Sequence, residues 1–141
     1  MYPADLVIPM KEELTENGFT EMITANDVNT QMQQNGTTLV VLNSVCGCSA
    51  GTARPGVLLA VANSATKPEF LKTCFAGFDV EAVNQVRQYL APYPPSSPAI
   101  ALFKNGALVH MIERHQIEGR SAQMIANSLI DAFEQHCGVA Q

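Results

Sequence analysis

Residues 38–48 read TLVVLNSVCGC, an apolar run that ends in two cysteines separated by one glycine. The run is rich in Leu and Val and almost unbroken, as expected of a β-strand that is covered on both faces. We therefore expect it to form a central strand of a sheet. The two thiols, Cys46 and Cys48, follow directly from the end of that strand.

The segment after the thiols predicts a helix. Residues 49–56 read SAGTARPG and lead into the apolar run VLLAVA at 57–62. A helix that begins here places both sulfurs near its exposed N–H groups and the positive end of its dipole, which favour a thiolate. Because the thiolate is the nucleophilic form of cysteine, this position indicates thiol–disulfide chemistry.

The composition predicts a single domain over residues 1–141. With 47% hydrophobic residues, a chain of this length buries roughly two thirds of its unfolded surface on folding. A net charge of -5 with 8 scattered Lys and Arg argues against nucleic-acid binding. The longest apolar runs fall short of the ~20 residues that a membrane span needs. Four cysteines without a signal-peptide pattern predict a reducing compartment, the cytoplasm.

Two helices are expected before the central strand. The first runs to Gly18 and carries apolar side chains at four-residue spacing: Leu6, Met10 and Leu14. The second begins at Thr24, which forms a capping box with Asp27, and ends at Gly36.

The elements expected after the thiol helix are a strand at 70–76, a helix capped by Asp79, a hairpin of strands 99–103 and 108–112 with a type I′ turn at Asn105-Gly106, and a helix from Ser121 with Ile125, Leu129 and Phe133 on one face. This order predicts an α/β, thioredoxin-like fold with a central mixed β-sheet flanked by helices.

The proline-rich loop at 92–98, PYPPSSP, enters the first strand of the hairpin. In a thioredoxin fold Ser97-Pro98 occupies the substrate loop, where a cis proline packs against the active thiols. We therefore expect a cis bond at Pro98 and backbone pairing between Ser97 and an extended substrate. Gly47 and Arg54 complete the expected substrate-binding residues, Arg54 because it could steady a thiolate or a carboxylate on a small thiol. A solvated side chain is the other interpretation of Arg54.

Four segments, VCGC at 45–48, GTARPG at 51–56, YPPSSP at 93–98 and HQIEGRS at 115–121, resemble the bacilliredoxins, with matches from Tyr2 to Cys137. The resemblance implies a cytoplasmic thioredoxin-like protein that removes bacillithiol from mixed disulfides with proteins and is also described as a disulfide isomerase. Its partners would be S-thiolated proteins and a low-molecular-weight thiol, with no organic cofactor. Cys74 and Phe78 depart from the family pattern.

We assign the attack to Cys46, which is first in the motif, and the resolving step to Cys48. A disulfide closed over one residue is strained, although Gly47 can absorb an unusual φ. Strain makes the disulfide a better oxidant, which favours exchange or isomerisation over general reduction.

A redox-inactive metal-binding or partner-binding module on the same scaffold is the alternative function. Only one tight pair of soft ligands exists in the sequence, so we assign no metal residues. We expect the other cysteines and histidines to have different roles. Cys74 should behave as a small buried apolar residue, and Cys137, at the end of a helix, should take no part in the chemistry. His110 should pack against its neighbours, and His115 should lie at the border of the site.

Overall fold

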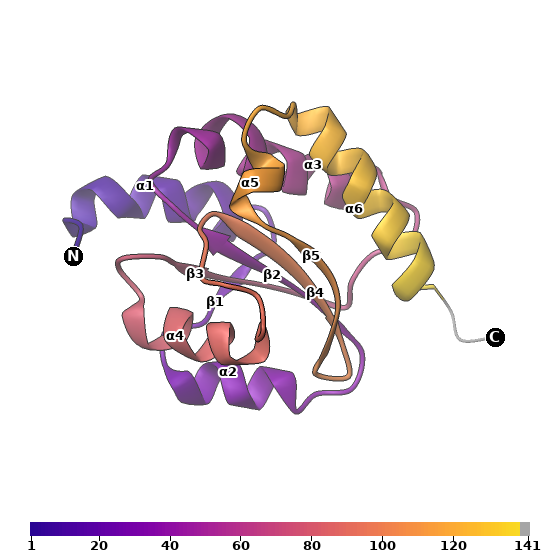
Figure 1. Cartoon of the computed structure of the whole chain (residues 1–141), viewed down its shortest axis with the longest axis horizontal. Helices are drawn as coiled ribbons and strands as arrows, with labels where there is room; N and C mark the ends of the chain where they lie inside the picture. Colours follow the sequence, from indigo (N-terminus) through magenta and orange to yellow (C-terminus); the bar gives the residue numbers. More distant parts are fainter. Residues whose placement is uncertain (139–141) are drawn as a thin grey trace.

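The computed structural model describes residues 1–138 and contains a five-stranded sheet with helices on both faces (Figure 1). The strands are β1 Thr20–Glu21, β2 Thr37–Asn43, β3 Phe70–Phe75, β4 Ala99–Lys104 and β5 Ala107–Ile112. They lie in the order β1-β3-β2-β4-β5, in which β1, β3 and β2 are parallel and β4 and β5 are antiparallel to their neighbours. The expected mixed sheet flanked by helices is confirmed.

The helices form two layers. The upper layer in Figure 1 comprises α1 Ala4–Thr15, the π-helix η1 Ser49–Ala53, α3 Arg54–Asn63, α5 Arg114–Ile117 and α6 Ala122–His136. The lower layer comprises α2 Ala25–Met32 and α4 Val80–Tyr89. No helix within residues 1–138 is both long enough and apolar enough to cross a membrane.

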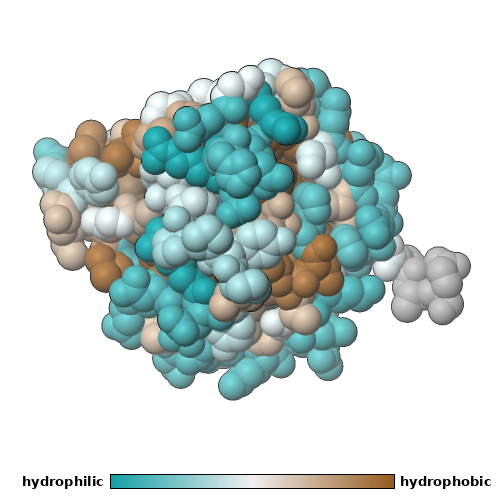
Figure 2. All heavy atoms as spheres, viewed as in Figure 1, coloured by the Kyte–Doolittle hydropathy of each residue, from teal (hydrophilic) through white to brown (hydrophobic). Residues whose placement is uncertain are grey.

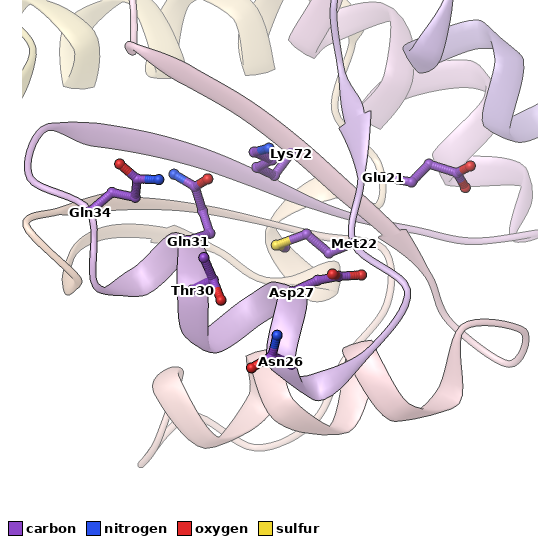
Figure 3. Close-up of a pocket in the computed structure, with 8 residues that line it drawn as sticks. All are labelled: Glu21, Met22, Asn26, Asp27, Thr30, Gln31, Gln34 and Lys72. Carbon is purple, nitrogen blue, oxygen red and sulfur yellow. The ribbon is translucent and has the colours of Figure 1, made fainter.

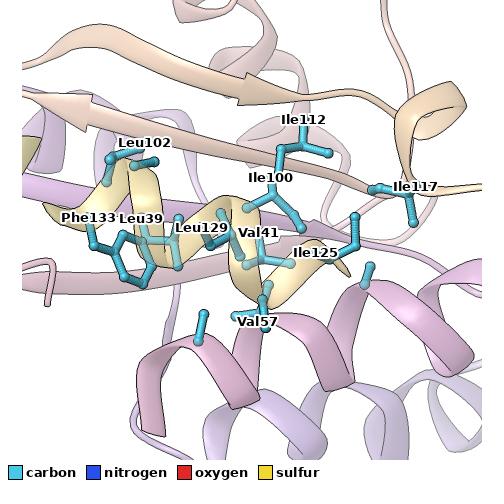
Figure 4. Packing of buried hydrophobic residues seen from close by; sticks show 14 of the residues in the cluster. Leu39, Val41, Val57, Ile100, Leu102, Ile112, Ile117, Ile125, Leu129 and Phe133 are labelled. Atoms are coloured by element: carbon cyan, nitrogen blue, oxygen red, sulfur yellow. The ribbon is translucent and has the colours of Figure 1, made fainter. Parts of the chain in front are cut away.

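β2 is the central strand, as predicted, and all seven of its residues are buried. Its side chains alternate between the two layers because successive residues of a strand point to opposite faces. Leu39 and Val41 pack with α3 and α6, as Figure 4 shows, whereas Val40 and Leu42 pack with α2 and α4. The unbroken apolar run of β2 therefore contributes to two hydrophobic cores, one on each side of the sheet.

Local sequence signals fix several element ends as predicted. Thr24 and Asp27 form the capping box of α2, and Ser121 accepts a hydrogen bond from the Met124 N–H at the start of α6. The hairpin turn between β4 and β5 has φ of 52° at Asn105 and 80° at Gly106, the positive values that a type I′ turn requires.

The apolar residues predicted for the first helix are confirmed as buried only in part: Leu14 is buried and Met10 is partly buried, whereas Leu6 is not. The buried residues are Val7, Lys11 and Leu14, while Leu6 is 45% exposed. Lys11 can be buried because its ammonium lies 2.9 Å from an oxygen of Asp79 and 2.6 Å from one of Glu21. A periodic apolar pattern could not reveal this because the cation and its partners are far apart in the sequence.

Asp79 stands at the N-cap position of α4, but its carboxylate does not cap that helix. It accepts hydrogen bonds from the Phe75 N–H at 2.9 Å and from Lys11, whose ammonium also lies 4.8 Å from the centre of the Phe78 ring. Asp79 therefore joins α1 to the end of β3.

Other differences concern short elements. Neither β1 nor α5 was predicted, because two and four residues are too few to show a period. The π-helix at the start of the thiol helix was also not expected. α1 and α2 end at Thr15 and Met32, before the Gly18 and Gly36 at which we had expected them to end.

At Gly56, helix α3 lies close against α6. A Cβ added to this residue would lie 2.8 Å from the Cβ and Cγ2 atoms of Ile125 and 3.0 Å from the Ala122 carbonyl oxygen. We expect Gly56→Ala to lower the free energy of unfolding by about 1–3 kcal/mol, because neither neighbour can move without shifting the α6 backbone.

Chemical denaturation of Gly56→Ala beside Gly51→Ala tests this, since nothing lies within 4 Å of a Cβ at Gly51. The control should keep its stability or gain up to ~1 kcal/mol. Equal stabilities for the two variants would contradict the close crossing.

Candidate active site

The two thiols lie in the turn between the end of β2 and η1, at the carboxyl end of the central strand. Cys46 and Cys48 are partly buried, and Gly47 between them is exposed with open space around it. The two sulfur atoms are 2.8 Å apart. Both predicted catalytic residues are therefore next to each other and within reach of a substrate.

The helix that follows begins on Cys46. The Cys46 carbonyl accepts hydrogen bonds from the backbone N–H groups of Ser49 at 2.9 Å and Ala50 at 3.4 Å. The Cys46 sulfur in turn is stabilised by the backbone N–H groups of Cys48 and Ser49. Cys46 thus occupies the place of a helix N-cap, where N–H groups without helical partners favour a negative charge, as the sequence predicts.

The environments of the two thiols displace their pKa values in opposite directions. The pKa of Cys46 is lowered, first by the hydrogen bond from the Cys48 thiol and then by the backbone N–H groups. Burial raises the pKa of Cys48 to about 11, and the hydrogen bond and charge of Cys46 add to this increase. Of the two thiols, Cys46 therefore loses its proton more readily and Cys48 retains its proton.

Arg114 supplies a positive charge to the thiols. Its charge lowers the pKa of both Cys46 and Cys48, and its side chain is 46% exposed. Sequence reasoning missed this residue because it lies far along the chain. Its neighbour His115 had been placed at the border of the site, and His115 is exposed beside Arg114 at the start of α5.

The Ser97-Pro98 bond is cis, as predicted, and Pro98 is buried at the start of β4. A second cis bond, Ala91-Pro92, was not foreseen. The Arg114 guanidinium donates from Nη1 to the Ser97 carbonyl at 3.4 Å. Arg114 thus links the expected substrate loop to the segment beside the thiols.

Arg54 does not have either role that its sequence position suggested. Its side chain is 1% exposed, which contradicts a solvated arginine and leaves no surface with which to bind a substrate. The guanidinium pairs with Glu13 of α1, with Nε 2.8 Å from Oε2. Its Nη1 donates to the Ser44 carbonyl at 3.0 Å and the Ser49 hydroxyl at 3.0 Å.

The buried Arg54 side chain therefore binds the turn on both sides of the thiols, since Ser44 precedes the two cysteines and Ser49 follows them. Asn43 completes this network: its Oδ1 accepts from Arg54 at 2.8 Å, and its Nδ2 donates to the Met10 carbonyl of α1 at 3.0 Å. The Ser44 hydroxyl accepts the Cys46 N–H at 3.0 Å.

The other cysteines and His110 lie apart from this chemistry. Cys74 is 1% exposed in the core between the sheet and α2 and α4, and burial raises its pKa to about 12. Cys137 follows the last turn of α6, where burial raises its pKa. His110 is partly buried on β5, which agrees with a packed role. Within residues 1–138, no three His, Cys, Asp or Glu side chains gather at one point.

A pocket of about 350 Å³ lies elsewhere, between α2 and the β1 edge of the sheet (Figure 3). Its lining is mostly polar and includes Glu21, Asp27, Gln31 and Lys72. None of the predicted site residues lines it, so the thiol chemistry does not use this pocket.

Comparison with known proteins bears on both the fold and the site. A family model described as disulphide isomerase matches residues 2–137. A bacilliredoxin of Cytophaga hutchinsonii is 57% identical over 96% of this chain and 99% of its own length. One from Bacillus licheniformis is 50% identical over 96% of this chain and 95% of its own length.

Among solved structures, a mutant thioredoxin from Halobacterium salinarum matches with a TM-score of 0.61 and 13% identity, covering 89% of this chain and 96% of that protein. A thioredoxin from Malassezia sympodialis matches with a TM-score of 0.58 and 16% identity, covering 86% of this chain and 95% of that protein. These likenesses confirm the predicted thioredoxin fold.

The opposite pKa displacements predict that the thiols titrate separately. The rate of alkylation of Cys46 by iodoacetamide should rise with pH along a curve whose midpoint lies below that of an unperturbed cysteine thiol, because the hydrogen bond from Cys48 and the backbone N–H groups lower the pKa of Cys46. In molecules whose Cys46 is still unmodified, Cys48 should react only as the pH approaches about 11, so its curve is taken from initial rates. Mass mapping of the alkylated peptides measures both curves.

Cys46→Ala provides the control for that titration. Removing the hydrogen bond and charge of Cys46 should move the Cys48 curve to lower pH, since both raise its pKa. Two cysteines that titrate together in the unchanged protein would contradict the assignment of the thiolate.

Removal of the buried guanidinium should loosen the thiol turn. Arg54→Met should lower the free energy of unfolding by about 1–3 kcal/mol, because Ser44 and Ser49 lose a donor in a buried setting. Glu13 is half exposed and stays solvated, so the loss is smaller than for a fully buried pair. The pH dependence of Cys46 alkylation should shift to higher pH. The reason is that the backbone N–H groups that lower the pKa of Cys46 would no longer be aligned with its sulfur.

Arg120→Met is the matched control, since it removes the same charge from an exposed side chain. It should change stability by less than about 0.5 kcal/mol. If denaturant midpoints and alkylation curves of Arg54→Met match those of the control, Arg54 does not hold the turn.

Proposed function

This chain belongs to the bacilliredoxin family, and we propose that it reduces mixed disulfides between protein cysteines and a low-molecular-weight thiol, of which bacillithiol is the first candidate. The family and the fold establish a thiol–disulfide redox role. They favour that role over a redox-inactive module on the same scaffold. The observation that carries the finer proposal is the pair of sulfurs 2.8 Å apart with pKa values displaced in opposite directions.

In the first step the Cys46 thiolate attacks the small-thiol sulfur of the mixed disulfide. A bond forms between that sulfur and Cys46, the old disulfide bond breaks, and the protein cysteine leaves as a thiolate that takes up a proton. The target protein is thereby restored, and the small thiol is held on Cys46. The attack uses the thiolate that the helix start and Arg114 stabilise.

In the second step Cys48 loses its proton and attacks the Cys46 sulfur, which releases the small thiol and closes a disulfide between the two cysteines. The dithiol has then given up two electrons, and two molecules of the small thiol can restore it. The order of steps has an electrostatic basis: once Cys46 carries an adduct it is uncharged, so the contribution of its charge to the raised pKa of Cys48 disappears.

Isomerisation is a second proposed activity, supported by the family description. In this route the Cys46 thiolate attacks a disulfide of the target protein, which forms a mixed disulfide between Cys46 and one target cysteine and releases the other cysteine as a thiolate. Burial still raises the pKa of Cys48 after Cys46 has reacted, so another thiol of the target protein can attack the mixed disulfide before Cys48 resolves it. That route shuffles disulfides without net oxidation of the pair. A reducing cytoplasm would keep both thiols ready for either activity.

The substrate loop supports a protein target. The backbone of Ser97 precedes the cis proline and is partly exposed, so an extended segment can pair with it. The exposed Gly47 leaves open space above the turn, where a bulky mixed disulfide can approach Cys46. We propose S-thiolated proteins as the partners and no organic cofactor.

Single-cysteine variants test the roles of the two thiols. Cys48→Ser should remove bacillithiol from a modified carrier protein and then stop with the small thiol bound to Cys46, because the resolving thiol is absent. Cys46→Ser should lose exchange by at least ~100-fold, because the remaining thiol stays buried and burial is the largest cause of its raised pKa. Intact mass and peptide mapping measure the adduct.

The same carrier modified with glutathione identifies the preferred small thiol. Faster loss of bacillithiol than of glutathione supports the proposal, and the reverse order would assign the protein to another thiol. An adduct mapped to Cys48 in active Cys46→Ser would exchange the two roles.

A further inference from the structure

We propose that Arg114 binds a carboxylate on the small-thiol half of the mixed disulfide, so that the site prefers anionic adducts to neutral ones. This inference rests on the proposed function and names the chemical class of its small-thiol substrate. Sequence reasoning considered such a role only for Arg54, which is buried and fully engaged with protein groups.

The segment that carries Arg114 is held beside the thiols from two directions. The Arg114 N–H donates to the Ser96 hydroxyl of the proline loop at 3.4 Å. At the other end, the Arg120 carbonyl accepts from the Thr52 hydroxyl of η1 at 3.0 Å. The Ile117 side chain between them is fully buried. Residues 114–120 therefore bridge the proline loop and η1, the helix that begins directly after Cys48.

The guanidinium is accessible and has donors to spare. Figure 2 shows a hydrophilic surface over α5, and the Arg114 side chain is 46% exposed. Of its five N–H groups, Nε donates to Glu118 at 2.8 Å and Nη1 donates to Ser97 at 3.4 Å. Within residues 1–138, Nη2 donates to no protein group. A planar guanidinium with open donors matches the two oxygens of a carboxylate.

The location suits the small thiol rather than the protein half of the substrate. Arg114 contacts the Ser97 carbonyl, and its segment is bound at Arg120 to Thr52 of η1, the helix that directly follows Cys48. Its charge also acts on both cysteine sulfurs, so we place it near the point where the small thiol becomes attached. A carboxylate a few bonds from that sulfur then falls within the range of a long arginine side chain. Arg54 cannot compete for it, because Glu13 already neutralises that charge.

Glu118 is the competitor for this site. It pairs with Arg114 one helical turn away, with both side chains about half exposed. Exposed pairs of this kind are weak, so a substrate carboxylate can take the place of Glu118. The pair would hold Arg114 in position between turnovers, and removal of Glu118 should strengthen the preference for anionic adducts.

The test uses one carrier protein modified either with 3-mercaptopropionate or with 2-mercaptoethanol, adducts of similar size of which only the first is charged. The measured quantity is the ratio of the second-order rate constants for their removal at one pH and low salt. A change in the reactivity of Cys46 affects both constants alike, so the ratio isolates recognition of the carboxylate. We expect the unchanged protein to prefer the charged adduct.

Arg114→Gln should lower this ratio by about threefold to tenfold, and Arg114→Lys should restore part of it because it keeps the charge without the fork of donors. Glu118→Gln should raise the ratio. Lys104→Gln is the matched control: it removes an exposed positive charge at the opposite end of the sheet, where Lys104 pairs with Thr37, and should leave the ratio unchanged.

Each remaining outcome has a definite meaning. If the Arg114→Gln and Glu118→Gln proteins both show the same ratio of rate constants as the unchanged protein, the carboxylate site is refuted and the proposed function stands. If Lys104→Gln lowers the ratio as much as Arg114→Gln, the preference comes from net charge and the site is refuted. If the unchanged protein removes neither these adducts nor bacillithiol, the proposed function fails and the inference fails with it.

Discussion

One buried guanidinium holds the active turn in place. Arg54 is enclosed beneath the two cysteines and donates to groups on both sides of them, while its charge is balanced by Glu13 from α1. A buried charge that loses its partners is expensive, so this network tolerates few arrangements of the chain. The turn is thereby fixed relative to β2, α1 and α3 at once, which keeps the sulfur of Cys46 aligned with the N–H groups that stabilise its thiolate.

Two ionic contacts join helix α1 to separate parts of the fold. Lys11 reaches Asp79 at the end of β3, and Glu13 reaches Arg54 at the start of α3. Each contact buries one charged group against another, and each joins segments far apart in the chain. The helix therefore connects the end of β3 to the start of α3 at the carboxyl end of the parallel strands, where the thiols also lie.

The two thiols work as one titrating unit. The Cys46 sulfur accepts a hydrogen bond from the Cys48 thiol. This hydrogen bond lowers the pKa of Cys46 and raises the pKa of Cys48. A thiolate that is stabilised too strongly would be a poor nucleophile, so modest stabilisation suits attack. In the proposed mechanism, the raised pKa of Cys48 keeps the second thiol inactive until Cys46 has reacted, which orders the two steps.

The sequence by itself determined the features that depend on neighbouring residues. Local patterns predict the buried central strand, the thiol pair at a helix start, the capping box at Thr24 and the Asn105-Gly106 turn. The cis bond at Pro98 was expected only from the place of the proline loop in the predicted fold, because the local sequence shows a proline but not its isomer. Only the tertiary structure decided which distant groups meet. Arg54 pairs with Glu13, which is 41 residues away in the sequence, and the charge of Arg114 acts on the thiols from a different element. Sequence periodicity reports which face of an element is buried, but a charge can lie on that face whenever a partner from elsewhere in the chain balances it, and no local pattern names that partner.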